Sequence, residues 1–249
     1  MNNFSGDFFD ESKKYKHVFF DVDNTLTRSR TLITDSMKSA LVALSSVADV
    51  IIVSGANEEQ IWKQITKDFL GNIYVLAQNG NSAISKNSEI LWKNSLSGVQ
   101  KQEIFAHIDN LRNVFPELSK NVDAEDQIQD RGCQVSFSCI GHNADLVRKE
   151  AFDPRGDRRQ EMLRKVPFES KNLEVKIGGT TCFDYFELGR NKGYNIRCLF
   201  NKLNWKSDDA LYFGDALFPG GNDSSVVGVC DTWSVENPQQ TLAVIRKMI

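Results

Sequence analysis

The sequence has 249 residues, of which 41% are hydrophobic and 25% charged, and its formal net charge is -3. This is the composition of a globular protein with a sizeable core, arranged as one large domain or two small ones. The slightly negative charge argues against nucleic-acid binding, which usually needs a basic surface, and no apolar run approaches the roughly 20 residues of a membrane span. We therefore expect neither a nucleic-acid nor a membrane partner.

The five cysteines are scattered without CxxC spacing, and the first residues contain no apolar signal-peptide core. Residues 1 to about 15 are polar, and we expect them to be loosely held. Scattered, odd-numbered cysteines are typical of reduced thiols rather than of a zinc site or a disulfide framework. These features together predict a cytoplasmic protein.

The first third of the chain alternates between short apolar runs and amphipathic segments. Residues 18–20 and 49–53 are β-branched or aromatic runs typical of buried parallel strands, and residues 73–77 form a third. Helical spacing follows the first two runs, with one apolar face made of Met37, Ala40, Leu41, Leu44 and Val47 and the next of Ile61, Ile65 and Phe69. A hairpin is predicted for residues 82–84 and 89–92. Strands that alternate with helices in this way predict βαβ units and a parallel sheet.

From about residue 96 the pattern changes. A helix is predicted around residues 104–111, a half-exposed antiparallel strand at 134–138, and helices within 148–166 that are interrupted at Pro154 and Gly156. Two further strands are predicted at 173–177 and 182–186. This section is typical of a separate α+β module.

The parallel pattern resumes near residue 191, with predicted helices at 192–203 and 239–248 and predicted strands at 211–213 and 226–229. The fold class that follows is α/β. We predict a Rossmann-like core with a parallel sheet from residues 1–95 and 188–249, and an inserted α+β cap domain at 96–187.

Two acids follow the first strand. Asp21 comes directly after the run VFF and Asp23 two residues later. They lie at the carboxyl end of the strand, where open α/β sheets bind their ligands. Each of two neighbouring carboxylates raises the pKa of the other unless a cation neutralises them. The pair therefore favours a hard metal ion, and Mg²⁺ is the best candidate.

Three further features can join this pair on a parallel sheet. Ser54 follows a strand and precedes a helix, so it can bind a phosphate with its hydroxyl or act as a helix cap. Lys192 begins a helix and could neutralise a phosphoryl oxygen, although most single lysines are solvated. The segment YFGDALFPGGND at 212–223 is a strand that ends in an acidic, glycine-rich loop. Its Asp215 and Asp223 are suited to hold Mg²⁺.

Taken in order, DVDNT, Ser54, Lys192 and GDALFPGGND resemble the four motifs of the haloacid dehalogenase superfamily. The resemblance implies that Asp21 is a nucleophile, Asp23 a general acid/base and Thr25 a phosphate-binding hydroxyl. It also implies that Asp21 and Asp215 bind Mg²⁺, with Asp223 and the backbone carbonyl of Asp23 as further candidate ligands.

The insertion resembles a type-2B cap, and the chain is most similar to the eukaryotic-type phosphomannomutases. The segments that carry this likeness are DVDNTLTRSR, NGNSAI, DRGCQVSFSCIG, GGTTCFDYFELGRNKGY and GDALFPGGND. By this resemblance Arg30 and Arg131 match sugar-phosphate-binding arginines, and Asp184 matches an acid that contacts the sugar.

The chain departs from that family at several positions. His142 stands where the family has an arginine, and Lys149 stands where counting places another, unless the loop slips by one residue and Arg148 takes that place. Cys182 replaces a serine, and Asn24 replaces a glycine. A guanidinium grips phosphate with two hydrogen bonds and an amine does not. These changes weaken the candidate phosphate site in the cap.

A mutase must hold a second phosphate in its cap, whereas a phosphatase need not. We therefore predict an Mg²⁺-dependent phosphatase that acts on a small phosphorylated metabolite, a sugar phosphate, through an aspartyl-phosphate. The alternative is a phosphomannomutase that interconverts mannose 6-phosphate and mannose 1-phosphate. A phospholigand sensor without activity is a third hypothesis, which the intact set of Asp21, Asp23, Lys192 and Asp215 disfavours. The sequence leaves a monomer and a homodimer both open.

Overall fold

The computed structural model describes residues 13–69, 71–120 and 122–249. Most of the N-terminal segment expected to be loosely held lies outside these residues. The chain forms two compact units: unit 1 contains the residues up to Lys93 together with Arg190–Ile249, and unit 2 contains Asn94–Gly189. No helix in the described parts of the chain is both long and apolar enough to cross a bilayer.

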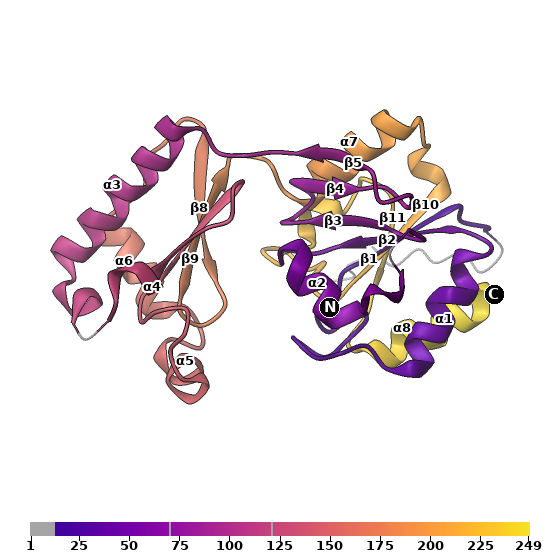
Figure 1. Ribbon diagram of the computed structural model, residues 1–249, viewed down its shortest axis with the longest axis horizontal. Coiled ribbons are helices and arrows are strands. Elements are labelled where there is room, and N and C mark those ends of the chain that lie inside the picture. The colour runs from indigo at the N-terminus through magenta and orange to yellow at the C-terminus, as the bar shows by residue number, and fades with distance from the viewer. Residues whose placement is uncertain (1–12, 70, 121) are drawn as a thin grey trace, which may run out of the picture. The chain divides into compact units, whose positions relative to one another are not determined.

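The described strands of unit 1 make a single sheet (Figure 1). Its order is β11 (Asp231–Ser234), β10 (Ala210–Gly214), β1 (His17–Phe20), β2 (Asp49–Val53), β3 (Tyr74–Ala77), β4 (Ser82–Ile84) and β5 (Ile90–Lys93). The strands from β11 to β3 pair in parallel, and β4 and β5 join them as an antiparallel hairpin. The predicted α/β fold with a parallel sheet is confirmed.

Both faces of this sheet are covered. The helices are α1 (Asp35–Ser45), α2 (Glu58–Ile65), α7 (Lys192–Leu203) and α8 (Pro238–Met248), with short 3₁₀ turns η1 (Lys67–Phe69), η3 (Ser207–Asp209) and η4 (Ser224–Val226). On β1, Val18 and Phe20 pack with residues of α1, α2 and α8, whereas Phe19 packs with residues of α7 on the other face. All three side chains are fully buried, which is why this strand reads as a continuous apolar run.

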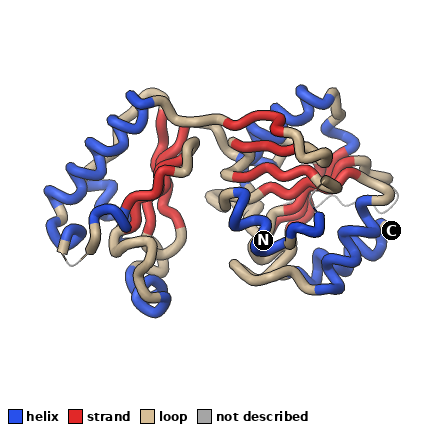
Figure 2. Tube along the Cα trace, in the orientation of Figure 1, coloured by secondary structure: helices blue, strands red, loops and turns tan. Residues whose placement is uncertain are grey.

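Unit 2 contains a second, antiparallel sheet (Figure 2). Its order is β6 (Ile128–Asp130), β7 (Gln134–Ser138), β9 (Cys182–Glu187) and β8 (Leu173–Gly178). Its helices are α3 (Gly98–Val114), α4 (Ala124–Gln127), α5 (Leu146–Phe152) and α6 (Asp157–Lys165), with a 3₁₀ turn η2 (Pro116–Ser119). One face of the sheet packs against apolar residues of α3 and α6, including Ile104, Ile108 and Met162. The helix break predicted at Pro154 and Gly156 separates α5 from α6, as expected.

Three predictions about these elements are wrong. The apolar run at 226–229 is not a strand, because Gly228 turns the chain with a φ of 79° and the strand β11 begins only at Asp231. Val47 lies beyond the end of α1 and is 65% exposed. Phe69 is buried but belongs to η1 rather than to α2.

The strand at 134–138 is also not half-exposed as predicted, since all five of its residues are buried. Its polar side chains have partners: the Ser136 hydroxyl donates to Asp184 Oδ1 at 2.6 Å, and Ser138 Oγ lies 3.4 Å from Thr181 Oγ1. An alternating pattern indicates which residues share a face of a sheet. The polar face can be buried as well as the apolar face when its side chains are hydrogen-bonded.

Candidate active site

Candidate site residues follow three neighbouring strands at the same edge of the unit 1 sheet. Asp21 comes after β1, and its backbone N–H donates to the Phe213 carbonyl oxygen of β10 at 2.9 Å. Asp215 follows the last residue of β10, and Ser54 follows the last residue of β2. Because β10, β1 and β2 are parallel neighbours, their carboxyl ends bring these residues to one place.

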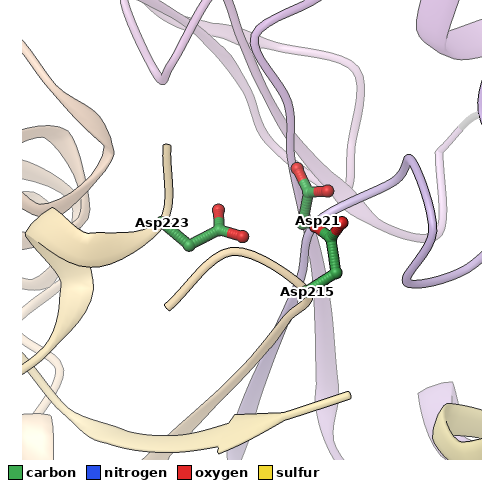
Figure 3. A group of neighbouring side chains, drawn as sticks. All are labelled: Asp21, Asp215 and Asp223. Carbon is green, nitrogen blue, oxygen red and sulfur yellow. The ribbon is translucent and has the colours of Figure 1, made fainter. Parts of the chain in front are cut away.

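Three carboxylates converge at this edge (Figure 3). Asp21, Asp215 and Asp223 each offer an oxygen, and these oxygens all lie within 4.8 Å of one another. Asp21 and Asp223 are buried, and Asp215 is partly exposed. The carboxylate of Asp23 is not part of this group among the described residues.

A fully buried lysine joins two of these acids. The ammonium of Lys192 donates to Asp21 Oδ1 at 2.5 Å and to Asp223 Oδ1 at 2.6 Å. Tyr212, which sequence reasoning did not single out, donates its hydroxyl to the same Asp223 oxygen at 2.6 Å. The other Asp223 oxygen accepts the backbone N–H of Ala216 at 3.2 Å. Lys192 is therefore not a solvated surface lysine, although its sequence position alone is typical of one.

Burial controls the charges of this group. It raises the pKa of Asp21 to about 7; Lys192 opposes the rise, while Asp223 and Asp215 add to it. Burial alone would lower the pKa of Lys192, but the two acids outweigh it and raise that pKa above its ordinary value. Burial also raises the pKa of Asp215, against a hydrogen bond from Asn24 that lowers it. Lys192 is thus held as an ammonium.

The donor set fits a divalent cation. When all four groups are ionised, three carboxylates and one ammonium leave two negative charges in a largely buried place, which is costly without a counter-ion. Carboxylate oxygens are the ligands that Mg²⁺ prefers. Asp21 and Asp215 are the better placed ligands, because Asp223 already accepts three hydrogen bonds.

Asp23 is held by a different set of partners. Its Oδ1 accepts the backbone N–H of Arg30 at 2.7 Å and the side-chain amide of Gln64 at 2.9 Å. Gln64 is 1% exposed and lies on α2 beside the buried Ile61 and Ile65. Sequence reasoning missed it, and the only signal was a polar residue on the apolar face of a predicted helix.

The two predicted phosphate-binding hydroxyls differ in their surroundings. Thr25 is fully buried, and its Oγ1 has no hydrogen-bond partner among the described residues. A buried hydroxyl without a hydrogen-bond partner is unfavourable, so a hydrogen bond to a ligand oxygen would stabilise it. Ser54 Oγ accepts the N–H of Ala56 at 3.1 Å, while the cap of α2 is Asn57. The alternative in which Ser54 caps the helix is therefore wrong.

Two glycines allow the close packing of this site. A Cβ at Gly214 would lie 2.5 Å from Asp223 Oδ2, and a Cβ at Gly193 would lie 1.9 Å from the Ser225 carbonyl oxygen. Neither position has room for a side chain. Glycine next to Asp215 and next to Lys192 thus allows the loop of Asp223 to approach both β10 and α7.

The candidate substrate-binding residues of the predicted cap belong to unit 2. His142 Nε2 lies 3.2 Å from the Ser136 carbonyl oxygen, and the Lys149 ammonium donates to the His142 carbonyl oxygen. Ser136, on β7, also donates to Asp184 on the neighbouring β9, so Ser136 connects His142 to Asp184. Arg131 lies in the turn between β6 and β7, where its guanidinium donates to Gln129 at 2.9 Å.

Cys182 belongs to the same neighbourhood. Burial acts to raise the pKa of its thiol, but hydrogen bonds with His142 and Thr181 outweigh burial and lower it. Three of the residues that depart from the resembled family pattern, His142, Lys149 and Cys182, are thus linked to one another through His142.

Comparison with solved structures shows the class of fold. A haloacid dehalogenase-like hydrolase from Bacteroides thetaiotaomicron aligns over 95% of this chain and 100% of its own, with a TM-score of 0.62 and 13% identity. An IMP-nucleotidase from Plasmodium falciparum aligns over 96% of this chain and 68% of its own, with a TM-score of 0.67 and 14% identity. At such identities the likeness concerns the fold alone, which is similar to that of a haloacid dehalogenase-like hydrolase.

Sequence comparison is more specific. The family model described as eukaryotic phosphomannomutase matches residues 37–249. Phosphomannomutase 2 of Dictyostelium discoideum is 29% identical over 235 residues, which cover 91% of this chain and 93% of the relative. A phosphomannomutase of Dendrobium officinale is 30% identical over 218 residues, covering 84% and 83%. The chain belongs to the eukaryotic phosphomannomutase family, as its motifs predict.

Proposed function

We propose that this protein is an Mg²⁺-dependent phosphomannomutase, which interconverts mannose 6-phosphate and mannose 1-phosphate through an aspartyl-phosphate at Asp21. The observation that carries the proposal is the buried group in which Lys192 joins Asp21 to Asp223 beside Asp215. Family membership supports the mutase, which sequence reasoning kept as the alternative, over the phosphatase that it placed first. We also propose that the protein is cytoplasmic.

In the proposed reaction, a carboxylate oxygen of Asp21 attacks one phosphorus of a hexose bisphosphate. The bond from phosphorus to the sugar oxygen breaks, and Asp23 gives that oxygen a proton. In the second half, Asp23 takes a proton from the free hydroxyl of a mannose monophosphate, and that oxygen attacks the aspartyl-phosphate, which frees Asp21 and forms mannose bisphosphate. Transfer of the other phosphate of this bisphosphate back to Asp21 then releases the isomer. The buried ammonium of Lys192 favours the ionised form of Asp21 against the effect of burial, and it would neutralise charge on the transferring group.

Thr25 and Ser54 would bind the phosphoryl oxygens. Support comes from the buried Thr25 hydroxyl without a partner and from the place of Ser54 after the strand beside β1. Mg²⁺, held by Asp21 and Asp215, would neutralise charge on the phosphoryl group as it transfers. The backbone carbonyl of Asp23 remains a candidate ligand.

We further propose that unit 2 is a cap that chooses the substrate, with Arg131 and Asp184 contacting the sugar phosphate, and that Arg30 of unit 1 contributes from the loop after β1. The hydrogen bond from Ser136 to Asp184 supports this role, since it fixes one oxygen of the acid and leaves the other to a sugar hydroxyl.

A sugar-phosphate phosphatase is the second candidate, and the cap favours it. The Lys149 ammonium is bound to the His142 carbonyl oxygen, and His142 Nε2 lies beside the Ser136 carbonyl oxygen. Groups engaged in this way are poorer phosphate ligands than free guanidinium groups. Losing one charge-assisted hydrogen bond, worth about 1.5–3 kcal/mol, would weaken a second phosphate about tenfold to a hundredfold.

The ratio of isomerised sugar to released phosphate decides between the two. We would incubate the protein with Mg²⁺, mannose 1-phosphate and a hexose bisphosphate activator, and follow both products. The mutase proposal predicts many isomerised molecules for each phosphate released. Stoichiometric release of phosphate without isomerised sugar would contradict it and leave the phosphatase.

A variant calibrates this measurement. His142→Arg restores the charged group of the resembled pattern, so it should raise the ratio if the cap limits retention of the second phosphate. Asp21→Asn serves as the blank, since it should form neither product.

A further inference from the structure

Gln64, on α2, forms hydrogen bonds with the loop that carries Asp23. Its side-chain amide donates to Asp23 Oδ1 at 2.9 Å, and the same nitrogen lies 3.4 Å from Thr27 Oγ1. Its backbone carbonyl oxygen accepts the N–H of Ile33 at 2.7 Å. Gln64 therefore contacts the loop near its start, in its middle and near its end.

The amide of Gln64 has a defined orientation. Its Oε1 faces the side-chain N–H of Gln60 at 3.4 Å, which leaves Nε2 as the group directed at Asp23. The residue is almost wholly buried, so water cannot easily replace it as a donor. A buried hydrogen bond to a charged acceptor is among the stronger ones in proteins.

These contacts give the two carboxylate oxygens of Asp23 different surroundings. Oδ1 accepts both the Gln64 amide and the backbone N–H of Arg30, which has a left-handed φ of 57°. Donors on one oxygen leave Oδ2 as the oxygen that can carry a proton. The carboxyl group cannot rotate without breaking both bonds.

We propose that Gln64 is a positioning residue that fixes the carboxyl group of Asp23, so that Oδ2 meets the leaving oxygen of the substrate. The inference rests on the proposed function, in which Asp23 is the general acid. In this role Gln64 acts through its hydrogen bond to Asp23.

The test uses substrates that differ in their need for an acid. The oxygen of a hexose leaves as an alcohol and needs a proton, whereas acetate leaves acetyl phosphate without one. General acid catalysis contributes about 10²–10⁴-fold, so a misplaced acid should cost at least about tenfold with hexose 1-phosphate and little with acetyl phosphate. The readout is the ratio of the two kcat/KM values for formation of the aspartyl-phosphate.

Gln64→Met keeps the size of the side chain and removes the donor. Gln64→Leu also removes the donor without adding a carboxyl group, and it replaces the methionine variant if that one does not fold. Lys63→Met is the matched control, because Lys63 is the exposed neighbour on the same helix. Thermal unfolding of each variant shows whether the fold is kept.

The proposal predicts that the ratio falls about tenfold or more in the Gln64 variants and stays unchanged in Lys63→Met. It also predicts that adding a Gln64 substitution to Asp23→Asn lowers the ratio no further, since both act on the same proton. Equal losses with both substrates, or no loss, would overturn the positioning role while the proposed function stands. If the wild type transfers phosphate from neither substrate, the proposed function and this inference both fail.

Discussion

Replacing Lys192 with methionine should destabilise unit 1 strongly. Methionine fills the space of the stem but removes the ammonium that lies 2.5 Å from Asp21 and 2.6 Å from Asp223. Removing one partner of a buried ion pair costs about 3–5 kcal/mol, because the remaining charge has no compensation. Here two carboxylates lose the same partner, so we expect a loss at the upper end of that range in metal-free buffer.

The size of the loss should depend on pH. In the folded protein the pKa of Asp21 is raised to about 7. The contribution of Asp21 to the stability of unit 1 is therefore full at low pH, where Asp21 is protonated, and it is lost as the pH rises through that value. Without Lys192 the pKa of Asp21 rises further, and the loss of stability continues to higher pH. The deficit of the variant should therefore grow above pH 7, by at most about 1.4 kcal/mol for each pH unit.

Urea unfolding followed by tryptophan fluorescence measures this effect in one unit. All four tryptophans lie in unit 1, namely Trp62, Trp92, Trp205 and Trp233. Lys202→Met, an exposed position on the same helix, is the control and should stay within about 0.5 kcal/mol of wild type. A Lys192→Met variant within 1 kcal/mol of wild type at pH 8 in chelator would refute the reasoning about the buried group.

Three further outcomes are expected. Asp21→Asn should lower phosphoryl transfer by several orders of magnitude while urea unfolding stays cooperative, and wild-type turnover in a pure preparation would reject Asp21 as nucleophile. Chelator should silence the protein and Mg²⁺ restore it, and Asp215→Ala should raise the Mg²⁺ concentration for half-maximal activity; full activity in excess chelator would exclude the metal. Burial lowers the pKa of His107, so unit 2 should lose stability below about pH 6.5, and His107→Gln should remove that slope in hydrogen exchange of unit 2 amides.

The sequence predicted most strands and helices because their apolar periods matched their burial. α7 begins at Lys192 and ends at Leu203, as predicted, because Asn191 caps it and its apolar residues share one face. The run at 226–229 was wrongly predicted to be a strand, because a short apolar run has the same sequence pattern in a strand and in a buried turn. Only the left-handed backbone of Gly228 distinguishes them, and a sequence does not show φ.

The candidate site was predictable where it follows strand ends and not where it depends on tertiary contacts. Asp21 and Asp215 each follow an apolar run, and parallel pairing alone brings them together. The burial of Lys192 and the roles of Gln64 and Tyr212 depend on packing between segments 171, 41 and 11 residues apart. Apart from the polar Gln64 on the apolar face of a predicted helix, nothing local in the sequence indicates these contacts.

The arrangement of unit 1 has a consequence for synthesis of the chain. Lys192, Asp215 and Asp223 all belong to Arg190–Ile249, and so does β10, which pairs with β1. A growing chain that has emerged up to Gly189 contains every residue of unit 2 but has β1 at the edge of an unfinished sheet. Such an edge exposes unpaired backbone groups and invites wrong pairing. Unit 2 can thus fold on the ribosome before unit 1, whose acidic site forms only with the last segment.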